Sequence, residues 1–208
     1  MKAKTQYMKT RISMAAQGIQ GTALEYRGDG MSYIEMDIPG VGKVEQGVHN
    51  GVVWEKSALM GPRIKEGDER FLALRQSALD SDWNWRKYYA AELQPSDPGE
   101  APEPSDKVVM TPKAGGSPET RYYSRKSGLL VKMATTQKSP LGEIMMEMLF
   151  SDYRSVGGVM MAFHNTVKAG PQTMEMVQET VQNNVPIPVD KRTPPPDVQA
   201  ILAKKAKP

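Results

Sequence analysis

Histidine and cysteine, the residue types most often used for acid–base, nucleophilic and metal chemistry, are scarce in this sequence. It contains no cysteine and two histidines, His49 and His164. The lack of cysteine excludes disulfides, thiolate metal ligands and cysteine nucleophiles. His49 stands beside Asn50-Gly51, a dipeptide typical of tight turns, and His164 stands in a predicted strand. Both positions favour an exposed or hydrogen-bonded histidine over a general base.

No motif with a defined chemical mechanism takes their place. The zinc signature H-E-x-x-H, the nucleophile elbow G-x-S-x-G and the phosphate loop G-x-x-x-x-G-K-[ST] are all absent. Residues 40–43, Gly-Val-Gly-Lys, resemble part of a phosphate loop, but they join two predicted strands and lack the following helix that would bind phosphate. We therefore expect a protein that is not an enzyme, with no catalytic residues, no metal site and no cofactor.

Composition indicates a globular domain of ordinary size. The chain has 208 residues, of which 39% are hydrophobic and 25% are charged, and this length suffices for one domain with a core. Lysine and arginine number 27 against 24 acidic residues, and the two signs are interspersed. The sequence pI of 8.9 therefore comes without a basic stripe, and we expect no nucleic-acid partner.

Neither a membrane span nor an export signal is visible. No apolar run approaches the roughly 18 residues that a transmembrane helix needs. Residues 1–6, Met-Lys-Ala-Lys-Thr-Gln, have no apolar core and no small-residue cleavage site. The chain is thus interpreted either as cytoplasmic or as the mature or trimmed form of an exported protein.

Methionine is the compositional anomaly. There are fifteen methionines, and seven of them fall between positions 145 and 176. One interpretation is an ordinary core that happens to be rich in methionine. The other is a methionine-lined surface for acyl chains, because the unbranched, polarizable thioether adapts to flexible apolar guests.

The chain reads as strands separated by glycine turns, which is typical of antiparallel hairpins. Within residues 32–38, Ile34, Met36 and Ile38 alternate with polar residues and so share one face of a strand. The strands predicted in the first part of the chain cover residues 8–17, 19–27, 31–38, 43–49 and 52–56.

Four later strands are apolar on both faces. They are predicted at residues 129–135, 143–150, 159–168 and 174–181. A strand that is apolar on both sides must be covered on both sides, by helices, by another sheet or by a ligand. This is the first indication of a binding function.

Two helices and one long loop complete the prediction. Residues 69–79 place an apolar stripe behind an acidic start, and residues 197–206 follow three prolines. The proline-rich acidic stretch 95–105 is interpreted as an exposed loop inside one domain rather than as a linker. We therefore expect one domain over residues 1–190 and a C-terminal tail with a short helix over residues 191–208.

Several motifs together resemble the LolA/LppX-like outer-membrane lipoprotein-sorting family. Residues 122–132 are similar to its "Tyr-x-D-x-x-TGLL" hairpin, and residues 150–159 to its "SDYRxVdGv" hairpin. Residues 38–43 and 50–54 resemble "lPGvGk…ngxvaW", and residues 181–188 resemble the closing strand. Each motif alone is weak, but five in the same order, spread between about Thr10 and Pro188, are fairly specific.

The resemblance implies a mainly β protein of the α+β class. Its single, strongly curved antiparallel sheet would form an incomplete β-barrel whose concave face is covered by helices. In this family the hollow between sheet and helices accepts acyl chains of lipoproteins or lipids in the periplasm. The N-terminal helix of the family has little room before residue 8. The family also has an arginine that holds a covering helix in place, and Arg11 is the only candidate for it in this sequence.

We therefore predict a non-enzymatic periplasmic carrier of acylated lipoproteins or lipids, with inner- and outer-membrane transfer proteins as further partners. The alternative is a structural or protein-interaction module of the cell envelope, since similar sequences also form the tail domain of insulinase-like metallopeptidase chains. A hydrolase would need a nucleophile and a base that the sequence does not reveal. The residues predicted to line the hollow are Ile34, Met36, Val52, Trp54, Met146, Met148, Met161 and Phe163 on strands, and Phe71 and Leu72 on the covering helix.

Overall fold

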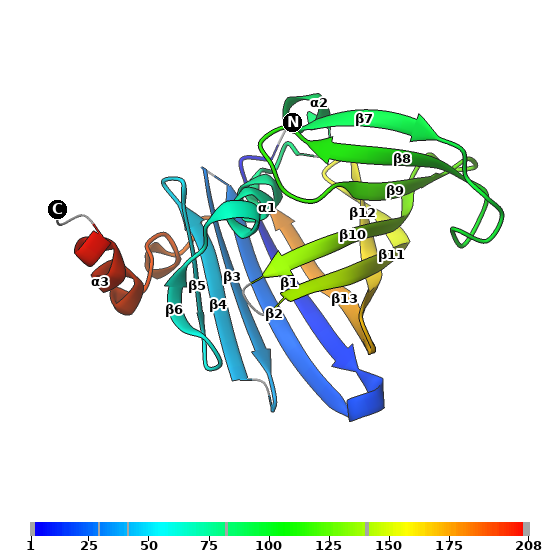
Figure 1. The fold of residues 1–208 in the computed structure, drawn as a ribbon. Coiled ribbons are helices and arrows are strands. Elements are labelled where there is room, and N and C mark those ends of the chain that lie inside the picture. The colour runs from blue at the N-terminus through cyan, green and yellow to red at the C-terminus, as the bar shows by residue number, and fades with distance from the viewer. Residues whose placement is uncertain (1–2, 29, 41, 82, 140–141, 206–208) are drawn as a thin grey trace.

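One antiparallel sheet of thirteen strands makes up most of the protein (Figure 1). The structure is a computed structural model, and it describes residues 3–28, 30–40, 42–81, 83–139 and 142–205. The strand order is β6-β5-β4-β3-β2-β1-β13-β12-β11-β10-β9-β8-β7, so the sheet is open and has β6 and β7 at its edges. The strands of the first part are β1 (Thr5–Met14), β2 (Ile19–Gly28), β3 (Met31–Ile38), β4 (Gly42–His49), β5 (Val52–Ser57) and β6 (Gly61–Ile64). Those of the second part are β7 (Tyr89–Gln94), β8 (Ser105–Pro112), β9 (Glu119–Ser124), β10 (Leu130–Ser139), β11 (Gly142–Val156), β12 (Val159–Ala169) and β13 (Gln172–Asn183).

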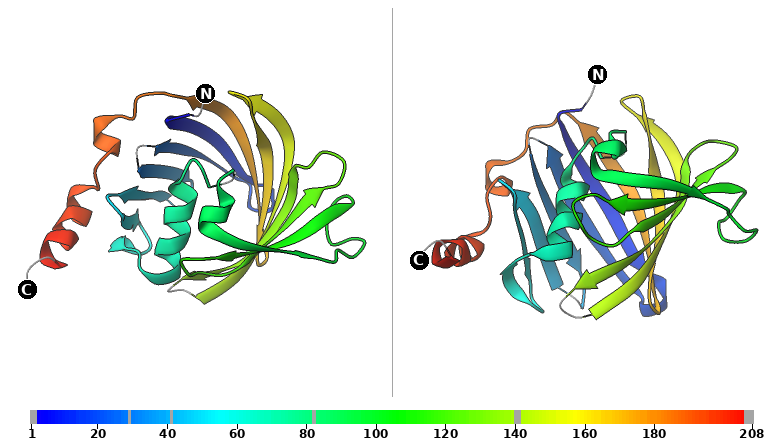
Figure 2. Two further views of the ribbon diagram at one scale, coloured as in Figure 1. Left: turned by 90° about the horizontal axis from the view of Figure 1, so that it is seen from above. Right: turned by 45° about the horizontal axis from the view of Figure 1, so that its top comes forward.

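The sheet curves around one helix, as the two views of Figure 2 show. Helix α1 (Gly67–Ser77) lies inside the curve and contacts β4 and β5 on one arm and β10 on the other. We call the face toward α1 the concave face and the opposite one the convex face. The predicted fold, a curved antiparallel sheet that does not close into a barrel and carries a few helices, is confirmed.

The tight turn at Asn50-Gly51 shows how the sequence sets the strand register. Both residues have positive φ, 49° and 74°, as the two-residue hairpin turn that favours Asn-Gly requires. The turn places His49 opposite Val52, and hence Val48 opposite Val53. Directly opposite residues share a face of the sheet, so this turn decides which side chains of β5 are concave.

Most predicted strands exist with shifted ends. The strand over residues 31–38 has its predicted bounds, whereas the first strand, predicted over 8–17, is β1 at Thr5–Met14 because a short 3-10 helix, η1 (Ala15–Gln17), follows it. Strand β11 runs on to Val156, beyond its predicted end at residue 150, and the turn falls at residues 157–158, within the segment 150–159 that was expected to form a hairpin. Asp152, with a φ of 51°, has no partner in the register to β12 and marks an irregularity rather than a turn.

No sequence pattern predicted the bounds of β6 to β9 or of the short helix α2 (Trp85–Tyr88). These strands alternate weakly; β7, for example, buries Tyr89 and exposes the next four residues. The proline-rich segment 95–104 joins β7 to β8 and is mostly exposed, and Ser105 already belongs to β8 and is buried.

The C-terminal tail packs on the convex face. After β13 a second 3-10 helix, η2 (Val189–Lys191), precedes α3 (Pro196–Lys205). Val198 of α3 is fully buried in a cluster with Trp54 and Ile187, to which Met31 and Tyr33 also belong. Of the two predicted helices, α1 covers the concave face as expected, while α3 lies on the other side.

Candidate functional site

Methionine gathers on the concave face of the sheet. Side chains alternate along each strand and directly opposite residues share a face, so the pairing registers assign every strand residue to one side. Ten of the fifteen methionines fall on the concave side. They are Met8, Met14, Met36, Met110, Met133, Met146, Met148, Met161, Met174 and Met176.

Most of these methionines are only half-buried. Met8, Met14 and Met110 are buried, and the other seven keep part of their surface exposed. One apolar cluster of this face, which we call the lower cluster, consists of sheet residues alone. Its members are Ile12, Met14, Ala23 and Ile38, with Ile19, Met36, Met174 and Met176 packed against them. In Figure 1 α1 lies above the ends of the strands that carry this cluster.

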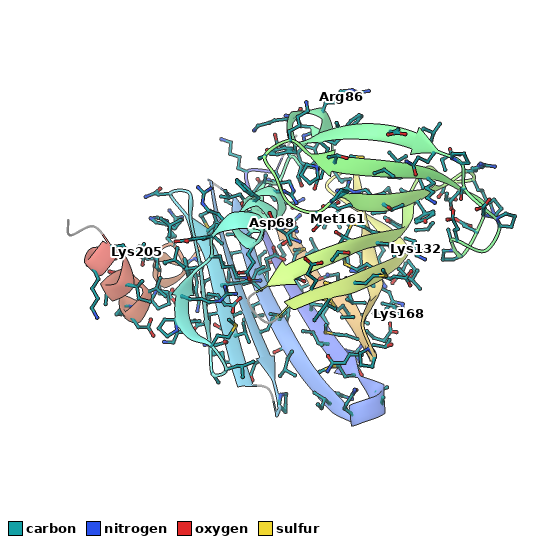
Figure 3. All side chains as sticks on the ribbon, in the orientation of Figure 1. Asp68, Arg86, Lys132, Met161, Lys168 and Lys205 are labelled. Carbon is teal, nitrogen blue, oxygen red and sulfur yellow. The ribbon has the colours of Figure 1, made fainter. Side chains whose placement is uncertain are left out.

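Polar side chains occupy the part of the concave face next to the C-terminal end of α1. Arg27 of β2 forms an ion pair of 2.9 Å with Glu25 and donates to the backbone oxygen of Gln76 at 3.2 Å. Desolvation raises the pKa of Glu25, and the positive charge of Arg27 lowers it, with desolvation the larger effect. Gln6 of β1 accepts a hydrogen bond from Arg27 and donates one to the sulfur of Met161 of β12, two strands away. Met161 is labelled in Figure 3.

The N-terminal half of α1 is held by ion pairs and hydrogen bonds to the part of the sheet formed by β4 to β6, which we call the first arm. Arg63 of β6 donates two hydrogen bonds of 2.7 Å to the carboxylate of Glu69. Arg63 and Lys65 also approach Glu55 of β5, at 3.3 and 2.7 Å. The hydrogen bonds from Arg63 lower the pKa of Glu69, against a smaller opposing effect of desolvation. Bidentate arginine–carboxylate pairs are among the stronger polar contacts in proteins.

The C-terminal half of α1 is held by Arg75 to the part of the sheet formed by β7 to β10, which we call the second arm. This side chain is 5% exposed and donates to the backbone oxygen of Gly115 at 2.9 Å. Its guanidinium lies 5.5 Å from the ring centre of Tyr89, and Arg121 lies 5.0 Å from the same ring. The Tyr89 hydroxyl in turn donates to Glu119 at 2.9 Å. Helix α1 thus bridges both arms mainly through polar groups.

The structure brings most predicted lining residues to the concave face. Ile34 and Met36, Met146 and Met148, and Met161 and Phe163 are concave on three parts of the sheet. On α1, Phe71 is half-buried, and a side chain at Gly115 would come within 3.1 Å of its ring. Leu72 is half-buried as well. Whether any of these residues binds lipid remains a prediction.

Val52 and Trp54, which were also predicted to line the hollow, do not lie on the concave face. The register puts both on the convex side, where Trp54 is 2% exposed in the cluster formed with the C-terminal tail. Val53 is the concave residue of this strand and is 1% exposed. Arg11 is also convex and pairs with Glu179 at 3.4 Å, so it does not contact α1. Arg27 and Arg63 are the arginines of the sheet that bond to α1 among the described residues.

Solved structures of the same architecture cover nearly the whole chain, although no family model and no curated protein matches its sequence. A DUF1329 family protein from Desulfovibrio piger aligns with a TM-score of 0.58 at 12% identity, over 92% of this chain and 90% of its own. A LolA superfamily protein from Nitrosomonas europaea aligns with a TM-score of 0.58 at 11% identity, over 93% and 91%. A putative outer membrane lipoprotein-sorting domain from Vibrio parahaemolyticus gives 0.53 at 9%, over 93% and 90%. The chain has a LolA-like fold.

In this LolA-like sheet, His164 lies on the convex side. Its Nε2 is 2.6 Å from Glu175 and its Nδ1 is 3.3 Å from the hydroxyl of Ser151. The arrangement resembles a serine–histidine–carboxylate relay, but the His164 and Glu175 side chains are 42% and 38% exposed. It lies across the sheet from the concave methionines. The expectation of a hydrogen-bonded histidine on the sheet surface agrees with these contacts.

The described residues of this chain contain neither a metal-binding cluster nor a helix that could span a membrane. No group of three or more histidine, aspartate or glutamate side chains there is arranged to hold a metal ion. None of the helices described is long and apolar enough to cross a membrane.

Proposed function

We propose that this protein is a non-enzymatic carrier that binds acyl chains on its concave face. The observation that carries the proposal is the gathering of ten methionines on that face, most of them half-buried. Thioether side chains reorient at low cost and contact flexible apolar guests well. Exposed methionine surface on the inner side of a curved sheet is therefore suited to chains of varying length and shape.

The energetics are adequate for reversible binding. Burial of each methylene group contributes about 0.8 kcal/mol, so about ten methylenes contribute about 8 kcal/mol, which corresponds to micromolar affinity. Such affinity allows cargo to be handed on without a covalent step. The polar contacts that fasten α1 can break and re-form in water more readily than a packed apolar interface of the same size.

The fold also bears on which class of ligand the protein would carry. The LolA-like architecture and the lipoprotein-sorting structure it resembles favour acylated lipoproteins or lipids as ligands. We place the carrier in the bacterial periplasm, where it would move cargo toward the outer membrane and meet transfer proteins of the inner and outer membranes.

Native mass spectrometry of the protein purified from a bacterial host, followed by organic extraction, tests the proposal directly. Extra mass that extracts as acyl lipid would support a carrier and identify its cargo. A protein without bound lipid that also fails to take up a fluorescent fatty acid would contradict it. That outcome would favour the alternative, a structural or protein-interaction module.

The binding face can be tested with neighbouring methionines of β11. Met146→Glu/Met148→Glu places two carboxylates on the concave face, and we expect at least a tenfold loss of fluorescent fatty acid binding because charge in an apolar site is costly. Met145→Glu is the matched control, since Met145 lies on the convex side and is 70% exposed. Circular dichroism would check that both variants keep their strands. Equal binding by both folded variants would rule out these concave methionines as the site.

A further inference from the structure

The two edge strands of the open sheet are built differently. Strand β6 has four residues, includes Pro62 and is in contact with α3. A short strand, a proline and a covering helix all keep the edge of a sheet from pairing with another chain. Strand β7 has six residues, contains no proline and pairs with β8 without a register shift. Residues 90–93 of β7 are all exposed, so this edge is open to a further strand (Figure 1).

Every second residue of β7 turns its backbone N–H and C=O groups away from β8. The N–H of Lys113, at the end of β8, donates to the oxygen of Tyr88 at 2.9 Å. Hydrogen-bonded pairs alternate along antiparallel strands, so Tyr89, Ala91 and Leu93 are the residues whose backbone groups face outward. The N–H of Tyr89 already bonds to α2. The outward N–H groups of Ala91 and Leu93 have no partner strand within the described part of the chain.

Opposite charges lie at the two ends of β7. At its start, Arg86 and Lys87 of α2 are exposed, and Lys113 lies beside them, donating to the backbone oxygen of Arg86 at 2.7 Å (Figure 3). At its end, the loop of residues 95–104 carries Asp97 and Glu103, which are exposed as well. None of these five side chains forms an ion pair with another described residue. Each end of β7 therefore has charge that is free to meet a partner.

The other charges near these ends either have partners or lie farther away. Those with partners are Glu100 with Lys107, Arg125 with Asp106, and Asp80 with the hydroxyl of Tyr88. Lys126 belongs to the β9–β10 turn, and β9 is two strands away from β7. The unpaired charge beside β7 is thus positive at the start of the strand and negative at its end.

We propose that β7 pairs antiparallel with β7 of a second copy of this chain, so that one sheet continues across a two-fold dimer. In a two-fold pair outward residues meet outward residues, and the possible centres are Ala91 and its neighbours. A centre at Glu92 would place two carboxylates opposite each other, and a centre at Ala90 would shorten the overlap because α2 directly precedes β7. A centre at Ala91 places Glu92 opposite Ala90 and Leu93 opposite Tyr89.

The same pairing brings the opposite charges together. Arg86 lies five residues before Ala91 and Asp97 lies six residues after it. An antiparallel pair centred on Ala91 therefore places the loop 95–104 of each subunit beside α2 of the other. Another protein would have to supply both charged groups at this spacing, whereas a second copy has them by symmetry, so we assign the edge to a second copy. The two-fold axis is perpendicular to the sheet, so both concave faces open on the same side.

Exchange of charge between two variants of the full chain tests the dimer. One variant is Arg86→Glu/Lys87→Glu, and the other is Asp97→Lys/Glu103→Lys. Analytical ultracentrifugation should show a concentration-dependent dimer for the unmodified protein. We expect the Kd of the dimer to rise about tenfold or more for each variant alone, because like charges then meet at both contacts. An equimolar mixture should dimerise again, because each contact between the two variants joins opposite charges.

Two further variants separate the backbone pairing from a general effect of charge. Ala91→Pro removes an N–H that faces outward and keeps the bonds to β8, because proline is tolerated at such edge positions. We expect it to weaken the dimer as strongly as the charge variants do. The matched control is Lys204→Glu/Lys205→Glu, which reverses two exposed charges of α3 at the other end of the sheet (Figure 3). The control should dimerise like the unmodified protein.

Unmodified protein that stays monomeric at every concentration would overturn the proposal. So would a mixture of the two charge variants that remains as monomeric as each variant alone, or a folded Ala91→Pro that dimerises as tightly as the unmodified protein. Circular dichroism checks that each variant is folded, and if Ala91→Pro does not fold, the charge exchange alone decides. None of these measurements involves an acyl ligand, so the dimer and the carrier function stand or fall separately.

Discussion

Arg70 and Arg75 of α1 both donate to a backbone oxygen of the sheet or its turns, yet their surroundings differ. Arg75 is buried beside Tyr89 and bonds to Gly115, whereas the bonds of Arg70 to Gly51 are exposed. Replacing Arg75 with methionine removes the hydrogen bond of a buried guanidinium to Gly115 and its contact with the ring of Tyr89. We expect Arg75→Met to lower the free energy of unfolding by about 2 kcal/mol, and Arg70→Met by less than about 0.5 kcal/mol.

Urea denaturation followed by circular dichroism measures both values. Similar losses for the two variants would mean that burial of Arg75 does not strengthen its hold on the second arm. A change in the slope of the transition for Arg75→Met alone would show in addition that this variant has a native or denatured state of altered compactness or no longer unfolds in a single step.

The β5 side chains show how far single residues predict which face of the sheet a side chain occupies. Alternation groups Val52 with Trp54 but does not say which of the two faces is concave. The two-residue turn at Asn50-Gly51 contains the missing information, because it pairs Val48 with Val53 and so turns Trp54 to the other side. The cover of Trp54 comes from Val198 and Ile187, far along the chain, and no local pattern predicts that contact. Gly47 lies directly under the ring, where a Cβ would come within 2.8 Å of it.

Among the elements, α1 has an attachment to the sheet that depends on pH. Hydrogen bonds from Arg63 keep the pKa of Glu69 below that of an unfolded glutamate. The pair therefore contributes its full stability above the unfolded pKa, about 4.3, and loses it as pH falls through the lower folded pKa. We expect unfolding free energy to drop between about pH 5 and pH 3 by roughly 1 kcal/mol more in the unmodified protein than in Glu69→Gln.

Glu66→Gln provides the control for this comparison. The hydrogen bond from Lys205 also lowers the pKa of Glu66, but that pair is exposed and screened by solvent. Denaturation curves at several pH values should separate Glu69→Gln from both other proteins. If Glu69→Gln keeps the full pH dependence, the contact with Arg63 does not hold α1.

Elements with strong patterns were predictable, and those without them were not. The alternation at residues 32–38 gave β3 with its bounds, and the acidic start followed by an apolar stripe gave α1 within two residues. Strands β7 to β9 escaped a definite prediction because charged and polar residues occupy many of their positions. Their place in the sheet depends on pairing with β10 and on the buried Tyr89–Glu119–Arg121 group, which the sequence does not display.

At the scale of the whole molecule, a single curved sheet separates two apolar regions. The convex region is closed by the C-terminal tail, with Trp54 and Val198 almost without exposed surface. The concave region keeps half-buried methionines beside a helix that is held by polar contacts. The order of thirteen strands could be anticipated only through the resemblance to lipoprotein-sorting proteins, since antiparallel patterns alone allow many orders.

Because the concave apolar region keeps exposed surface while the convex one is closed, we expect an acyl ligand that binds the concave face to stabilise the whole fold. A ligand that binds only the folded protein adds about 2.7 kcal/mol when its concentration is a hundred times its Kd. For a chain of this size that corresponds to a rise in Tm of roughly 5 to 10 °C. Thermal unfolding with a saturating fatty acid should show the rise in the unmodified protein and in Met145→Glu, and not in Met146→Glu/Met148→Glu. An equal rise in all three proteins would place the ligand on another surface, because the concave methionines would then contribute nothing to its binding.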